Sequence, residues 1–169
     1  MTGIQFVVAA QESVTNARSV VGLRDNPMLS KGIRVLVVED NPNWSKILLS
    51  LLQDATSLVP AGSVSNGVEA VEHAARTRPD LILLDIGLPR LNGLDAARRI
   101  RAVSSASKII FVTENSDPDF VQAALSIGAR GYVLKSRVAG ELLSAIDIVL
   151  NDGIFVSDHL PGSPCKSEL

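Results

Sequence analysis

Short runs of apolar residues alternate with amphipathic stretches along the chain from residue 33 to residue 150. The short runs are rich in β-branched residues and nearly continuous, which is typical of strands buried on both faces. The longer stretches carry apolar residues three or four positions apart, which is typical of helices that pack by one face. This alternation occurs five times and predicts five strands, each followed by a helix.

The expected strands cover residues 33–38, 58–64, 81–84, 109–112 and 131–134, and helices are expected to begin at or near residues 42, 68, 93, 118 and 138. Asn41 and Asp117 each stand directly before a proline, so their side chains can cap a helix whose first position is that proline. Pro60 cannot donate a hydrogen bond to a neighbouring strand, which predicts that the second strand lies at an edge of the sheet.

The alternation predicts an α/β fold with a parallel sheet. Strands that are apolar on both faces require helices on both faces, which favours a doubly wound sheet over a barrel of about eight units. We therefore expect a flavodoxin-like five-stranded parallel sheet in the order 2-1-3-4-5. We divide the chain into a weakly structured extension (1–31), a folded domain (32–152) and a tail (153–169). Alternatively, the working protein begins at Met28.

Composition narrows the class of protein. The chain has 169 residues, of which 46% are hydrophobic, and a formal net charge of −2. These values fit one globular domain and exclude a disordered chain. They argue against a general nucleic-acid or membrane-surface binder, which would show a strong basic excess. The single cysteine, Cys165, excludes an internal disulfide. The chain has neither ~18 consecutive apolar residues nor a basic signal-peptide start, so we expect a cytoplasmic protein.

Polar residues follow four of the five expected strands. Glu39 and Asp40 follow the first, Asp85 the third, Thr113 the fourth and Lys135 the fifth. The carboxyl ends of parallel strands lie along one edge, and ligands bind there at the point where the strand order reverses. The order 2-1-3-4-5 makes the first and third strands neighbours, so the three carboxylates are expected to face one another.

Such a carboxylate cluster must hold protons or a cation, because two like charges ~4 Å apart cost roughly 4 kcal/mol near a protein surface. Hard oxygen ligands at an open edge suit Mg²⁺. An ionised aspartate is also a competent nucleophile toward phosphorus. Lys135 supplies a second positive charge for phosphoryl oxygens, and the Thr113 hydroxyl offers one more hydrogen bond.

These residues stand in motifs that together resemble the response-regulator receiver domains of bacterial two-component signalling. The matching stretches, in chain order, are Val37–Asn41, Leu84–Pro89, Asn92–Gly93, Val112–Thr113 and Gly131–Lys135. Each motif alone is weak, but five correctly placed motifs between Ile33 and about Leu150 are specific.

The resemblance implies a role for each site residue. Asp85 is implied to accept a phosphoryl group from a sensor histidine kinase or a phosphotransfer protein. Asp40 and Asp85 are implied to bind Mg²⁺ directly, together with the carbonyl of Gly87, while Glu39 acts mostly through water. Lys135 is implied to pair with Asp85 or its phosphate.

The resemblance also implies a switch and an output surface. Thr113 is implied to move toward the phosphoryl oxygen and Tyr132 to turn inward with it, which changes the surface of helix four, strand five and helix five. That surface is also the implied contact of a homodimer. The stretch Gly131–Ser136 looks most like receivers that carry a C-terminal helix-turn-helix domain. No such domain follows here, so we expect a stand-alone receiver without direct nucleic-acid or membrane binding, or else a truncated transcriptional regulator.

Three other functions are disfavoured. Haloacid-dehalogenase-like phosphatases need a second aspartate two residues after the nucleophile, where this chain has Gly87, so we do not expect an enzyme. A nucleotide-binding domain needs a glycine-rich loop where Glu39–Asn41 stands. A degenerate receiver is disfavoured because the expected site residues are present. One departure from the receiver pattern is Glu114, a carboxylate beside Thr113 that we expect to hinder phosphoryl entry.

Overall fold

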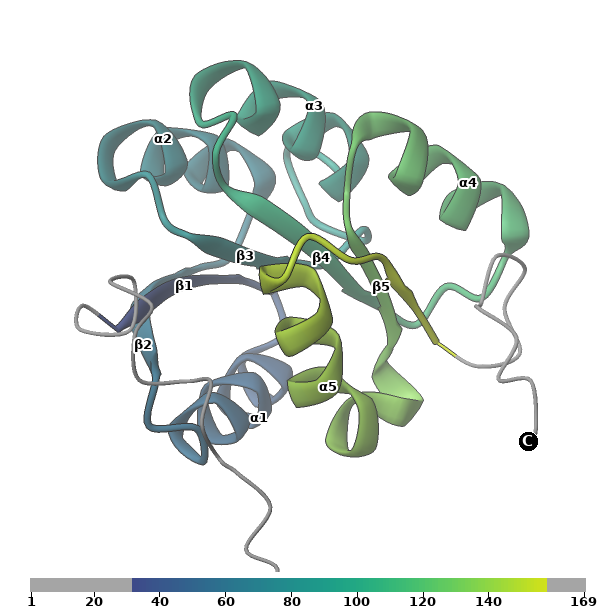
Figure 1. Cartoon of the computed structure of the whole chain (residues 1–169). Helices are drawn as coiled ribbons and strands as arrows, with labels where there is room; N and C mark the ends of the chain where they lie inside the picture. Colours follow the sequence, from purple (N-terminus) through teal and green to yellow (C-terminus); the bar gives the residue numbers. More distant parts are fainter. Residues whose placement is uncertain (1–31, 158–169) are drawn as a thin grey trace, which may run out of the picture.

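The computed structural model describes residues 32–157, so the predictions for residues 1–31 and for the end of the tail lie outside the described residues. Its centre is a parallel sheet in the order β2-β1-β3-β4-β5-β6 (Figure 1). The strands are β1 (Ile33–Val38), β2 (Leu58–Val64), β3 (Leu81–Leu84), β4 (Lys108–Thr113), β5 (Gly131–Leu134) and β6 (Phe155–Val156). The predicted α/β class and the order of the first five strands are confirmed.

Five α-helices cover the sheet: α1 (Pro42–Gln53), α2 (Gly67–Thr77), α3 (Gly93–Val103), α4 (Pro118–Ile127) and α5 (Val138–Leu150). A short 3₁₀ turn, η2 (Lys135–Arg137), joins β5 to α5. In Figure 1, α2, α3 and α4 lie on one face of the sheet, and α1 and α5 lie on the other. None of the helices within residues 32–157 combines the length and the apolar character that crossing a bilayer requires.

Two hydrophobic cores form because strand side chains alternate between the faces. In β1, Leu36 and Val38 join the core beneath α2, α3 and α4, whereas Val35 and Val37 join the core beneath α1 and α5. All four side chains are at most 1% exposed. The near-continuous apolar character of this strand therefore reflects burial on both faces, as the sequence predicts.

Two helices, α1 and α4, begin directly after the capping residues expected from the sequence. The side chain of Asn41 accepts hydrogen bonds from the backbone N–H groups of Asn43 and Trp44 at the start of α1. Asp117 accepts a hydrogen bond from Asp119 at the start of α4. Each cap satisfies N–H groups that have no partner within the helix.

The sequence analysis missed β6. Residues Phe155–Val156 pair in parallel with β5, so the sheet has six strands and continues beyond residue 152, where we placed the end of the folded domain. The N–H of Ser157 donates to the carbonyl of Tyr132 (2.9 Å), and the Ser157 hydroxyl accepts from the N–H of Leu134 (2.9 Å). These bonds satisfy backbone groups along the edge of β5.

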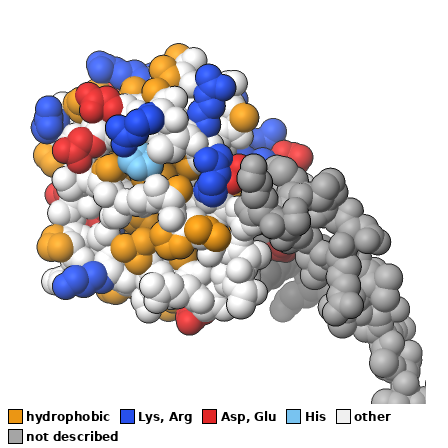
Figure 2. Space-filling view, turned by 90° about the vertical axis from the view of Figure 1, so that its left-hand side faces the viewer, with side chains coloured by type: hydrophobic (Ala, Val, Ile, Leu, Met, Phe, Trp, Pro, Cys, Tyr) orange, Lys and Arg blue, Asp and Glu red, His pale blue; other side chains and the backbone are white. Residues whose placement is uncertain are grey.

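Figure 2 views the molecule from the side of β2, the other edge of the sheet. Pro60 lies within this edge strand, as predicted. An apolar area near the centre of this face is flanked by both basic and acidic side chains (Figure 2). The mixture of signs on this face is in keeping with the near-zero net charge of the chain (Figure 2).

Candidate functional site

Three carboxylates meet at the carboxyl-terminal edge of the sheet. Glu39 and Asp40 follow β1, and Asp85 follows β3. These strands are hydrogen-bonded neighbours, with Val38 paired to Leu84 in register. One carboxylate oxygen from each acid lies within 4.8 Å of the others. The juxtaposition expected from the strand order is therefore present.

Lys135 joins this acidic cluster from β5, which is separated from β3 by β4. Its Nζ atom lies 2.8 Å from Oδ2 of Asp85 and 2.7 Å from Oε2 of Glu39. Lys135, Asp85 and Glu39 are only 6%, 7% and 3% exposed. The long lysine side chain thus reaches across the edge of the sheet and forms a buried ion pair with two acids.

Burial and charge shift the pKa values in this cluster. Burial raises the pKa of Glu39, against the opposing effects of Lys135 and of the N–H of Asn41. Burial alone would lower the pKa of Lys135, but its close contacts with the Asp85 and Glu39 carboxylates outweigh this effect and raise the pKa above its usual value. Lys135 is therefore an ammonium at neutral pH, and it contacts two of the three clustered carboxyl groups.

The acidic cluster fits a hard divalent cation. Asp40 is exposed, and within residues 32–157 it forms no ion pair. The Oε2 atom of buried Glu39 has no aligned hydrogen-bond donor, although the ammonium of Lys135 is close. Carboxylate oxygens that are partly open to water are the ligands that Mg²⁺ uses, and a cation there would offset the excess negative charge.

The backbone around Asp85 holds its carboxylate in place. Oδ1 accepts hydrogen bonds from the N–H groups of Ile86 (2.6 Å) and Gly87 (3.4 Å). Gly93 begins α3 directly against this loop, and its N–H donates to the carbonyl of Ile86 (2.9 Å). A Cβ atom on Gly93 would lie 1.9 Å from the carbonyl oxygen of Asp85, so the glycine of the Asn92–Gly93 motif permits this close packing.

Gly87 leaves the space beside Asp85 open. It is exposed, and a Cβ atom there would meet only Oδ2 of Asp85, at 4.0 Å. Gly87 has no side chain that transfers protons, which is the property that argued against a phosphatase.

Thr113 and Tyr132 lie beside the acidic cluster and are linked to each other through Asn115. The hydroxyl of Thr113, which is 3% exposed, accepts a hydrogen bond from the N–H of Asn115 (3.3 Å). The Tyr132 hydroxyl donates to the carbonyl of the same residue (2.8 Å), and its ring is fully buried. The ring therefore already lies inward. Thr113 makes no hydrogen bond to Asp85 within the described part of the chain.

Sequence analysis missed two contributors. The pairing of Asn115 with Thr113 and Tyr132 is made by backbone groups, which leave no residue signature. The second contributor is Trp44. The structure places it half-buried, with its ring centroid 5.4 Å from Nζ of Lys135. Its position near the start of α1, shortly after Glu39–Asp40, was the only available signal.

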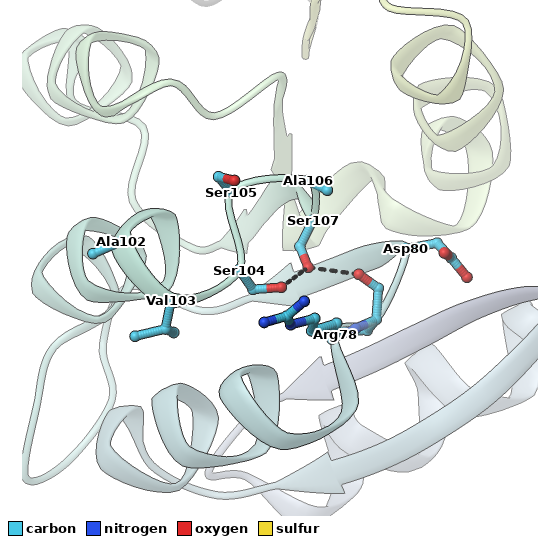
Figure 3. Close-up of a pocket in the computed structure, with 9 residues that line it drawn as sticks. Arg78, Asp80, Ala102, Val103, Ser104, Ser105, Ala106 and Ser107 are labelled. Atoms are coloured by element: carbon cyan, nitrogen blue, oxygen red, sulfur yellow. Dashed lines mark hydrogen bonds between the residues drawn. The ribbon is translucent and has the colours of Figure 1, made fainter.

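A hollow of about 330 Å³ lies at the opposite ends of the strands, where β3 and β4 begin (Figure 3). Its lining includes Arg78, Ser104 and Ser107. The hydroxyls of Ser104 and Ser107 lie 2.7 Å apart, and Ser107 also donates to the carbonyl of Pro79 (Figure 3). These hydroxyls bind the protein's own groups and are remote from the acidic cluster, so we assign the hollow no role.

Known proteins are similar to this chain in sequence and in fold. The response regulator receiver domain family matches residues 35–147. The chain is 33% identical to the nitrate/nitrite response regulator protein NarL of Escherichia coli over 112 residues, which is 66% of this chain and 52% of NarL. The chain therefore spans about half the length of that relative.

Solved structures agree with the sequence comparison. A LuxR-family two-component response regulator from Aurantimonas superposes with a TM-score of 0.70 and 28% identity, covering 75% of this chain and 89% of that one. The response regulator domain of Thermotoga maritima CheB gives a TM-score of 0.67 and 30% identity, covering 72% of this chain and 98% of that one. With its fold, its acidic cluster and these matches, the chain belongs to the response-regulator receiver domain family.

Proposed function

We propose that Asp85 is the phospho-acceptor of this receiver domain and that the donor is the phosphohistidine of a sensor kinase or phosphotransfer protein. An oxygen of Asp85 forms the new O–P bond as the P–N bond of the donor breaks, and the electron pair of that bond stays on the imidazole nitrogen. The observation that carries this proposal is the buried contact between Asp85 and Lys135. The ammonium is already in place for the phosphoryl oxygens that arrive.

Asp40 and Asp85 would hold Mg²⁺ with the carbonyl of Gly87, and Glu39 would contribute through water. The ion would supply positive charge that offsets the repulsion between the carboxylate and the phosphoryl group. Asp40 is suited to this role because it is exposed and next to buried Glu39. The hydrogen bonds from Ile86 and Gly87 keep one oxygen of Asp85 oriented while the other faces Lys135.

Phosphorylation would then change the surface formed by α4, β5 and α5. The added group brings a charge of about −1.5 to −2 and oxygens that accept hydrogen bonds. Thr113 would turn its hydroxyl toward them and weaken its bond with Asn115, whose carbonyl holds the Tyr132 hydroxyl. The loop before α4 would thereby be displaced, and the chain would act as a signalling module rather than as an enzyme. Output partners, including a second copy of the chain, would bind this surface.

Intact mass after incubation with acetyl phosphate and Mg²⁺ tests the acceptor. We expect the wild type to gain one phosphoryl group and Asp85→Asn to gain none, while Glu72→Gln, an exposed acid on α2, behaves as the wild type. Equal labelling of wild type and Asp85→Asn would refute the assignment of Asp85.

Thermal unfolding with and without Mg²⁺ tests the metal ligands. A ligand that binds only the folded state stabilises it by about 2.7 kcal/mol at a hundred times its Kd. We expect Mg²⁺ to raise the Tm of the wild type and of Glu72→Gln, and to raise that of Asp40→Asn much less. The same increase in all three proteins would exclude Asp40 as a ligand.

A further inference from the structure

We infer that Trp44 is a positioning residue that holds the ammonium of Lys135 at Asp85 during phosphoryl transfer. The ring centroid of Trp44 lies 5.4 Å from Nζ of Lys135, within the range of a cation–π interaction. This inference rests on the proposed function, because it assigns a role in the transfer to a contact outside the acidic cluster.

The ammonium is surrounded by groups from three elements. Asp85 follows β3, Glu39 follows β1, and Trp44 stands in the first turn of α1. The backbone N–H of Trp44 is bound by the capping side chain of Asn41 at 3.4 Å, which fixes the start of the helix that carries the ring. The half-buried indole is thus a third group beside the ammonium, in addition to the two carboxylates.

The contact between Trp44 and Lys135 would matter during phosphoryl transfer. While Asp85 is a carboxylate, it holds the ammonium by a hydrogen bond of 2.8 Å. Once an oxygen of Asp85 carries the phosphoryl group, the ammonium must leave that oxygen and bind the phosphoryl oxygens instead. Attraction to the face of an indole does not depend on one hydrogen-bond direction, so it persists while the ammonium exchanges acceptors.

A purely structural role predicts a different pattern of effects. Trp44 also packs at the margin of the core beneath α1 and α5, so an apolar side chain of any kind would serve if packing were its only task. Replacement by Phe or Tyr keeps an aromatic face but reduces the volume of the side chain. Replacement by Leu or Met keeps an apolar side chain but removes the aromatic face. Aromatic and aliphatic variants therefore separate packing from the interaction with Lys135.

The test compares Trp44→Phe and Trp44→Tyr with Trp44→Leu and Trp44→Met, each shown to be folded by circular dichroism. The rate of phosphorylation by acetyl phosphate is measured at saturating Mg²⁺, and Mg²⁺ affinity is measured separately. We expect the aliphatic variants to be slower by about threefold to tenfold and the aromatic variants to stay within about twofold of wild type. Mg²⁺ affinity should be unchanged in all four, since Trp44 offers no ligand oxygen.

A double-mutant cycle with Lys135→Met tests independently whether Trp44 acts through the ammonium. If the ring acts through the ammonium, the step from Trp44→Phe to Trp44→Leu should have no further effect on the rate when Lys135 is absent. A wild type that is phosphorylated at Asp85 while all four variants match it, or while the aromatic and aliphatic variants fall equally, would overturn the inference alone. A wild type that gains no phosphoryl group would overturn the proposed function and this inference with it.

Discussion

The Nζ atom of Lys135 lies 2.8 Å from Oδ2 of Asp85, although fifty positions separate the two residues in the chain. The two side chains meet because β3, β4 and β5 are parallel neighbours whose carboxyl ends share one edge. Both are buried, so the ammonium and the carboxylate have each lost most of their hydration and compensate for that loss by pairing.

Replacement of Lys135 by Met should therefore affect both stability and phosphorylation. The variant leaves Asp85 and Glu39 buried without their cation, so we expect the free energy of unfolding at neutral pH to fall by about 3 kcal/mol. Phosphorylation by acetyl phosphate should slow by about 10²-fold or more, as when a preorganised charge is lost. Denaturant titration and intact mass measure the two effects.

Lys46→Met provides the matched control, because Lys46 is exposed on α1. It should change stability by less than about 0.5 kcal/mol and leave the rate of phosphorylation as it is. If Lys135→Met changed stability and the rate of phosphorylation as little as Lys46→Met, the buried ion pair would contribute to neither.

Replacement of Gly93 by Ala tests the packing of the loop that carries Asp85. The new methyl group would lie 1.9 Å from the Asp85 carbonyl oxygen, so the backbone must move, and we expect a loss of about 3 kcal/mol or more. Gly140→Ala, within α5, has open space around its Cβ position and should gain about 0.5–1 kcal/mol. Denaturant titrations that rank the two variants in the opposite order would contradict this packing.

Much of this fold was predictable because its information is local. Hydrophobic periodicity located the first five strands and all five helices, and Asn41 and Asp117 marked helix starts. By contrast, β6 has two residues, too few for a period, and its pairing depends on the free edge of β5. Strand order likewise predicted the meeting of the carboxylates.

The finer contacts of the site were not predictable in this way. Whether Lys135 reaches Glu39 as well as Asp85 depends on the rotamer of a long side chain, which the sequence pattern does not encode. The contact of Trp44 with that ammonium depends on the direction in which α1 leaves β1. The bonds of Asn115 are made by its backbone and would be formed by many other residues.

Tyr132 should make stability depend on pH in the alkaline range. Burial, followed by the charges of Asp117 and Asp85, raises the pKa of its hydroxyl above the usual value of 10.0. Because the pKa of Tyr132 is higher in the folded than in the unfolded protein, its protonated hydroxyl stabilises the folded state fully below about pH 10. This stabilisation is lost as the pH rises through the pKa of the folded state. Tyr132→Phe lacks this contribution at every pH. It also loses the hydrogen bond to Asn115, which should lower its free energy of unfolding by about 1 kcal/mol.

The difference in unfolding free energy between the wild type and Tyr132→Phe should therefore narrow above pH 10. Lys135 contributes equally to both proteins and cancels from the comparison. Because Tyr132 is the only tyrosine, ultraviolet absorbance reports its ionisation directly. A tyrosinate signal that appears at the pH of free tyrosine, in protein that is still folded, would contradict the buried position of the ring.

Glu114→Ala tests the carboxylate that follows Thr113. Glu114 is exposed at the end of β4, where its charge can repel an incoming phosphoryl donor. Its removal should speed phosphorylation or dephosphorylation by a few-fold at low ionic strength and by less in high salt. Glu72→Ala removes an exposed acid from α2 and should alter neither rate. If Glu114→Ala is phosphorylated and dephosphorylated at the same rates as the wild type, Glu114 does not hinder phosphoryl entry.

Chemical trapping of the phosphorylated residue tests the central claim most directly. Borohydride reduces an acyl phosphate to an alcohol, so a phosphorylated aspartate becomes homoserine, which peptide sequencing by mass spectrometry can locate. After treatment with acetyl phosphate and Mg²⁺, we predict homoserine at position 85 and at no other aspartate. Homoserine at Asp40 or elsewhere, with position 85 intact, would contradict the assignment of Asp85 as the phospho-acceptor.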